Sequence, residues 1–115
     1  MDKARVQRYV EQAQEHSESP IRVARFDEGH AVFSRLMMRM PEAKLIILPG
    51  VIYIAPSTAA VEEILRRLER ELWYYSEREK VKEKEREIRE NMNGIREMLQ
   101  TDTRKYTSRN AIICK

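Results

Sequence analysis

The chain has little of what enzymes and secreted domains commonly use. Its single cysteine, Cys114, cannot form an internal disulfide and is typical of a reducing compartment. With two histidines and three glycines, it contains neither a phosphate-cradling loop nor a metal-ligand spacing. No apolar run approaches the roughly 20 residues of a membrane span, and we expect no signal peptide. We therefore expect a soluble cytoplasmic protein that is not an enzyme, with no cofactor, membrane contact or small-molecule substrate.

Charge, in contrast, is abundant and unevenly placed. Asp, Glu, Lys and Arg make up 36% of the 115 residues, which is typical of long exposed helices. Residues 101–115 contain four basic side chains against one acidic, so this tail carries the entire net charge of +3. Basic and aromatic residues mixed in this way are typical of RNA-contacting segments, although a plain solubilising tail fits equally well. The candidate RNA contacts are Arg104, Lys105, Tyr106, Arg109 and Lys115.

The first 40 residues predict a helix and then a β-hairpin. Residues 2–16 have apolar residues at helical spacing, namely Val6, Tyr9, Val10 and Ala13. Residues 21–26 are rich in β-formers, and residues 27–30 predict a turn. Residues 31–40 fit strand and helix periods equally well, and we favour a strand because the turn and a β-prone segment precede them. Asp27, Glu28 and His30 could hold a metal, but a solvated turn explains them better.

A second hairpin is predicted by two apolar runs, residues 45–48 and 51–55, that flank Pro49-Gly50. Pro-Gly favours a type II turn rather than the types that two-residue hairpin loops prefer. We therefore expect a bulge or a slightly longer loop at this point. Runs that are apolar on both faces indicate burial in a small antiparallel sheet or barrel.

Residues 57–99 predict one long helix that begins at Ser57 as its N-cap. A first apolar seam has the spacing of a coiled coil and is expected to pair with the N-terminal helix, with Trp73 and Tyr74 covering the hairpin–helix junction. Its residues are Val61, Leu65, Leu68, Leu72 and Tyr75. A charged stretch, residues 76–87, separates it from a second stripe that no other helix can reach. We expect that stripe to bind a client or partner; it comprises Ile88, Met92, Ile95, Met98 and Leu99.

This order of elements resembles the α-type subunits of prefoldin and their relatives over residues 21–99. The resemblance depends on residues 23–26 and 31–33, the hairpin of residues 45–54, and the amphipathic start of the next helix at residues 59–65. It implies that the hairpins join those of other subunits in a β-barrel body, and that helices projecting from the body hold unfolded clients. The N-terminal helix is shorter here than in that family, and the tail has no counterpart in it.

The sequence therefore predicts an α+β fold with one domain over residues 1–100, consisting of helix 2–16, hairpins within 21–55 and long helix 57–99, followed by the basic tail 101–115. The leading functional hypothesis is a prefoldin-like subunit whose partners are other such subunits and unfolded protein. The alternative is a small factor associated with a ribosome or another ribonucleoprotein, with the tail on ribosomal RNA or protein. A third hypothesis is a homodimeric coiled-coil adaptor.

Overall fold

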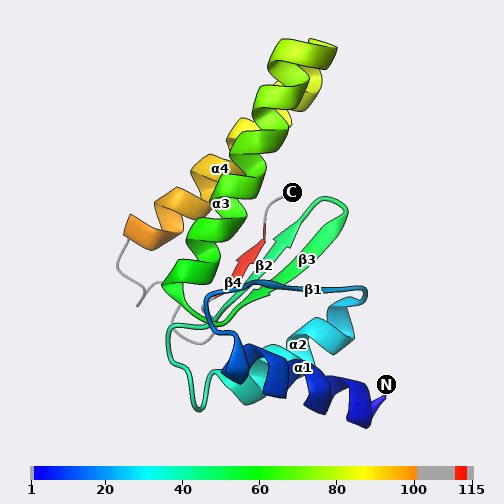
Figure 1. Cartoon of the computed structure of the whole chain (residues 1–115), viewed down its shortest axis with the longest axis vertical. Coiled ribbons are helices and arrows are strands. Elements are labelled where there is room, and N and C mark those ends of the chain that lie inside the picture. The colour runs from blue at the N-terminus through cyan, green and yellow to red at the C-terminus, as the bar shows by residue number, and fades with distance from the viewer. Residues whose placement is uncertain (1, 101–110, 114–115) are drawn as a thin grey trace.

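A small sheet lies between two pairs of helices (Figure 1). The structure is a computed structural model that describes residues 2–100 and 111–113, with side chains described for residues 2–99. Its α+β class is the one that the sequence predicts. In chain order the elements are α1 (Lys3–Glu15), β1 (Ile21–Val23), α2 (Phe26–Leu36), β2 (Lys44–Leu48), β3 (Val51–Ala55), α3 (Thr58–Trp73), η1 (Tyr74–Glu79), α4 (Lys82–Gln100) and β4 (Ala111–Ile113).

The sheet has the strand order β1-β3-β2-β4. β3 pairs antiparallel with β1, where Ile21 is opposite Ile54, and with β2, where Leu48 is opposite Val51. β4 lies parallel to β2 at the other edge of the sheet. Side chains alternate along a strand, so successive residues of one strand point to opposite faces of the sheet. Each face is covered by a different pair of helices.

Each face of the sheet forms a hydrophobic core with one helix pair. Leu45 and Ile54 face α1 and α2, whereas Ile46 and Leu48 face α3 and α4. The core on the α1–α2 face also contains Val6, Val10, Ala13, Ile21, Val23, Val32, Phe33, Leu36 and Ala43. The core on the α3–α4 face also contains Ala55, Ala60, Val61, Ile64, Leu68, Ile88, Met92, Ile95 and Met98.

The elements with strong local signals form as the sequence predicts. α1 lies within one residue of its expected bounds, and Asp2 caps it by accepting hydrogen bonds from the N–H groups of Ala4 and Arg5. Ser57 caps α3 through the N–H of Ala60. The β2–β3 hairpin also forms, but the expected bulge or longer loop is wrong. Its loop has two residues, and Gly50 has φ of +80°, the region that the second central residue of a type II turn requires.

The expected first β-hairpin is wrong in its second half. Residues 26–36, which include the predicted turn and most of the favoured strand, form helix α2. This helix places Val32, Phe33 and Leu36 in the core against the sheet. The two periods were equally compatible with the sequence, and packing against the hairpin from residues 44–55 favours the helix.

The expected continuous helix over residues 57–99 is wrong as well. The chain leaves the helical path at Lys80, whose φ of 55° is left-handed, and α4 then returns beside α3 (Figure 1). An ion pair between Glu69 and Arg96, with an N–O distance of 3.0 Å, joins the two helices. α3 and α4 thus form an antiparallel helical hairpin instead of one projecting rod.

The expected seam between the N-terminal helix and residues 61–75 is not formed either. Val6, Val10 and Ala13 belong to the α1–α2 face of the sheet, while Val61 and Leu68 belong to the α3–α4 face. The sheet therefore separates the two halves of the predicted seam. Tyr9 packs at the edge of the first core, and Leu65, Leu72 and Tyr75 pack at the edge of the second.

Candidate functional site

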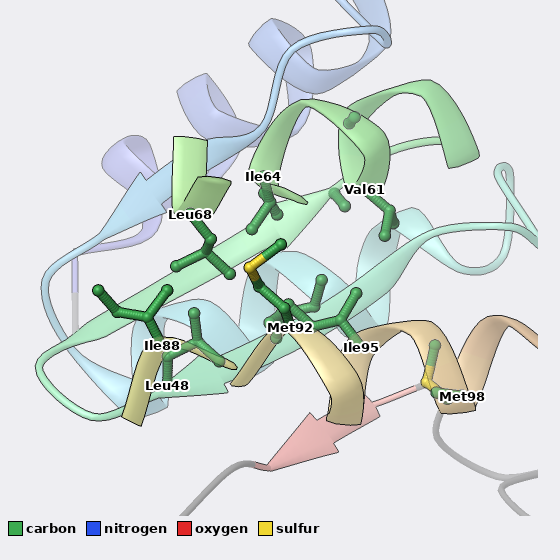
Figure 2. Packing of buried hydrophobic residues seen from close by; sticks show 11 residues of the cluster. Leu48, Val61, Ile64, Leu68, Ile88, Met92, Ile95 and Met98 are labelled. Carbon is green, nitrogen blue, oxygen red and sulfur yellow. The ribbon is translucent and has the colours of Figure 1, made fainter. Parts of the chain in front are cut away.

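The stripe predicted to bind a client is mostly buried. Ile88, Met92, Ile95 and Met98 are at most 4% exposed and belong to the same core, and Figure 2 shows the first three gathered with Leu48, Ile64 and Leu68. Leu99, at 37% exposed, is the one residue of the predicted set that reaches the surface. The expectation that this stripe lacks an intramolecular partner is therefore wrong, because the chain reversal at Lys80 brings α4 onto the sheet.

The cluster of Asp27, Glu28 and His30 does not form a metal site in the structure. Among the described residues, no three His, Cys, Asp or Glu side chains are grouped so that they could hold a metal ion. His30 lies in α2, with its ring 6.1 Å from that of Phe26. The proposed RNA contacts, Arg104, Lys105, Tyr106, Arg109 and Lys115, lie outside the residues whose side chains are described.

The buried carboxylate of Glu28 has a structural explanation. Glu28 is 4% exposed, and one of its carboxylate oxygens lies 2.9 Å from Nε of Arg5. The charge and hydrogen bond of Glu28 raise the pKa of the Arg5 guanidinium. This pair joins α1 to α2, and a buried carboxylate that is paired in this way needs no further ligand.

An open groove of about 650 Å³ lies beside the β2–β3 turn. Its wall includes Tyr9, Arg22, Ile47, Val51 and Ile52, and Arg22 is the only charged side chain among its lining residues. A single guanidinium without a nucleophile or general base does not form a catalytic constellation. We assign no chemistry to this groove.

The most distinctive surface lies at the tip of the α3–α4 hairpin, which extends beyond the sheet (Figure 1). Trp73, Tyr74 and Val81 are 57%, 43% and 38% exposed, and they are three of the six large apolar side chains exposed among the described residues. We call these three residues the tip surface. Trp73 and Tyr74 were expected to cover the junction with the β-hairpin, and that expectation is wrong because they lie at the opposite end of α3.

The rings of Tyr74 and Tyr75 are held in place by their neighbours. The Tyr74 hydroxyl donates a hydrogen bond to the Glu79 carboxylate at 2.6 Å. That hydrogen bond and the negative charge of Glu79 raise the pKa of Tyr74. The rings of Tyr74 and Tyr75 meet edge to face at 5.2 Å, and Nζ of Lys84 in α4 lies 5.8 Å from the centre of the Tyr75 ring. The exposed ring of Tyr74 is thus fixed by contacts with Glu79 and Tyr75.

The backbone of the tip is irregular. Residues 74–79 are wound as a π-helix, a rare geometry that is frequent at functional sites. The N–H groups of Lys80 and Val81 both donate to the carbonyl oxygen of Tyr75, which ends the helix. The sequence signal for this site was the aromatic triplet at residues 73–75 immediately before a charged run, but that signal does not reveal that the chain turns there.

The charges around the tip are nearly balanced. Residues 70–84 contain five basic and four acidic side chains. A site for phosphate groups requires a clear basic surplus, which this surface lacks. Exposed Trp and Tyr with mixed charges at the rim are typical of protein-binding surfaces.

Among the described residues, no helix is both long enough and apolar enough to cross a membrane. Comparisons with protein-family models, curated proteins and solved structures found no match to this chain.

Proposed function

We propose that this chain is a non-enzymatic protein-binding module that contacts a partner protein through the tip surface. The observation that carries the proposal is the exposure of Trp73, Tyr74 and Val81 together at the end of a projecting helical hairpin. Trp and Tyr are the residues that most often dominate protein–protein binding energy, because they bury a large rigid area. The single cysteine supports a cytoplasmic location.

The proposal differs from the prefoldin-like hypothesis in the residues that bind. That hypothesis required two β-hairpins and a helix whose end is not packed on its own chain. The described residues contain one such hairpin, and α4 is packed on the sheet. The partner contact is therefore placed at residues 73–81 instead of at the buried stripe of α4.

The test compares two exposed aromatic residues on different parts of the fold. Trp73→Ala removes the main ring of the tip, and Phe26→Ala, at a position 54% exposed at the start of α2, is the matched control. A tagged full-length chain is used to capture partners from its native source after photo-crosslinking. We expect one protein to be captured by wild type and by Phe26→Ala, and lost with Trp73→Ala.

Capture that survives Trp73→Ala and fails with Phe26→Ala would place the contact on the α1–α2 side and reject the proposal. Both variants should keep the wild-type melting temperature to within a few degrees, since neither side chain belongs to a core. A circular dichroism melt of each variant checks this before the capture is interpreted.

A second candidate function is association with RNA, and one observation favours it. The whole net charge of +3 resides in residues 101–115, while residues 1–100 are formally neutral. Deletion of residues 101–115 should then remove RNA binding, and binding by the full chain should weaken as salt rises, because neutralised phosphates release counterions. Equal RNA retention by the full and truncated chains would reject this candidate.

A further inference from the structure

The turn between α3 and α4 is built from residues that do not favour it. Lys80 is the only residue other than glycine with positive φ among the described residues. A Cβ atom makes the left-handed region unfavourable, and glycine is the usual residue where a helix ends in this way. The turn is also short, since two residues, Lys80 and Val81, separate η1 from α4.

The local sequence favours a straight helix through the same point. Residues 76–87 contain no glycine or proline, and ten of the twelve are Glu, Lys or Arg. These three residue types have high helix propensity. The reversal at Lys80 is therefore favoured by tertiary contacts and opposed by local preference.

The contacts that hold the reversal closed are those of α4. Its apolar face, made of Ile88, Met92, Ile95 and Met98, is buried against the sheet and α3 (Figure 2). The Glu69–Arg96 ion pair adds a contact at the surface. A chain that became helical through Lys80 would carry α4 away from its own sheet. It would then expose both the stripe and the surface that the stripe had covered.

We propose that α4 exchanges between two copies of this chain to form a helix-swapped dimer. In this dimer residues 58–100 form one continuous helix, and α4 of each copy packs on the sheet of the other. Every buried contact of the closed form is recovered, and the left-handed residue is removed. Short hinge loops under strain are the usual setting for such exchange.

The charges around the hinge, residues 80–81, favour a second copy of this chain as the partner in the exchange. Residues 76–87 contain five acidic and five basic side chains, so the segment is neutral. Two such segments that run antiparallel across a two-fold axis meet without net repulsion and with opposite charges available to each other. This inference goes beyond partner binding at the tip surface and does not depend on it.

The first test changes the hinge and measures assembly. Lys80→Gly removes the penalty for the left-handed backbone and weakens the straight helix, whereas Lys80→Ala removes the same charge but keeps a Cβ atom and favours helix. Full-length proteins are refolded over a range of concentrations and analysed by sedimentation. We expect wild type and Lys80→Ala to form dimers, and Lys80→Gly to raise the dimer dissociation constant by about tenfold or more.

The second test identifies which chains are in contact. Glu69 and Arg96 are changed to cysteine in a Cys114→Ser background, and the pair is linked with a short bismaleimide. The swapped dimer gives a covalent link between two chains, whereas a closed monomer or an unswapped dimer gives only an internal link. A dimer with internal links only, or wild type and Lys80→Ala that stay monomeric at all concentrations, would overturn the proposal. Loss of partner capture with Trp73→Ala, with the crosslinks unchanged, would concern the tip surface alone.

Discussion

The two helix pairs cover the same sheet but are held together by different means. α1 and α2 come from separate segments joined through β1, and they are locked by the Arg5–Glu28 pair and by the close approach of Gly29 to the sheet. α3 and α4 are consecutive, extend beyond the sheet, and reverse at an unfavourable residue, Lys80. Both pairs share an apolar core with the sheet, but the ion pair between α1 and α2 has a buried carboxylate, whereas the one between α3 and α4 is exposed.

The largest expected effect tests whether α4 belongs to the core. Ile95 is fully buried, so Ile95→Ser should lower the free energy of unfolding by about 4 kcal/mol through the cavity and the buried hydroxyl. Leu99→Ser, on the same helix at a position 37% exposed, should change it by less than about 1 kcal/mol. Urea unfolding measures both. Equal effects would mean that α4 does not pack as described and that the comparison fails.

A smaller effect is expected where α2 approaches the sheet. A Cβ atom on Gly29 would lie 3.0 Å from Cγ2 of Val23 and 3.2 Å from Cγ2 of Ile52. Gly29→Ala should therefore destabilise the protein by about 1–2 kcal/mol, because overpacking outweighs the gain in helix propensity. Ser34→Ala, on the exposed face of the same helix, should be neutral or slightly stabilising. A stabilising Gly29→Ala in urea unfolding would show that α2 is not tightly packed.

The N-cap residues of α1 and α3, Asp2 and Ser57, should differ in their contribution to stability by less than the pairs of substitutions above. Ser57 accepts from the N–H of Ala60 and also donates to the carbonyl oxygen of Ser17, a contact that ties the start of α3 to the loop after α1. Ser57→Ala should lower the stability by about 1.5 kcal/mol, and Asp2→Ala, at an exposed cap, by about 0.5–1 kcal/mol. Thermal unfolding of both variants gives the order, and the reverse order would contradict the contact with Ser17.

The smallest expected effect is on how the stability of the protein changes as the pH falls. Glu63 lies near the guanidinium groups of Arg66, Arg67 and Arg70, and the hydrogen bond from Arg66 is the largest cause that lowers its pKa from 4.5. A carboxyl group whose pKa is lower in the folded state adds stability above its unfolded pKa and loses it as the pH falls through the folded value. Wild type should therefore lose slightly more stability than Glu63→Gln between pH 6 and pH 3. Melting temperatures across that range check the difference, and parallel curves would contradict it.

The parts of the fold that were predictable from sequence are those with short-range causes. The apolar spacing of Val6, Val10 and Ala13, the Pro49-Gly50 turn and the Ser57 cap each lie within a few residues of their effect. Residues 31–40 fitted the strand period and the helix period equally well, and packing of α2 against the sheet favours the helix. The break at Lys80 has no glycine or proline to mark it within the charged stretch, because it results from burial of Ile95 and its neighbours against distant strands.

The candidate site was missed for the same reason. Trp73 and Tyr74 were visible as aromatic residues beside a seam, but their exposure depends on the chain turning back six or seven residues later. The stripe from Ile88 to Leu99 was found correctly as an apolar face, but it was expected to lack a partner within the chain, since the helix that carries it was taken to be straight. The prefoldin-like hypothesis depended on that straight helix and on the first hairpin, part of which is helix α2 in the structure.

The two-residue link of Lys80 and Val81 has a consequence for how the chain responds to its own abundance. In the structure the tip surface lies where this link folds back, and under the exchange proposal two copies straighten the link together and change the geometry of the tip. When the total concentration of the chain rises, a larger fraction of it forms the dimer. The concentration of folded-back tips therefore rises by a smaller factor than the total concentration. A partner bound at the tip would in turn oppose exchange, because it binds one of the two forms alone. Under the exchange proposal, the turn at Lys80 therefore makes this surface sensitive to protein concentration.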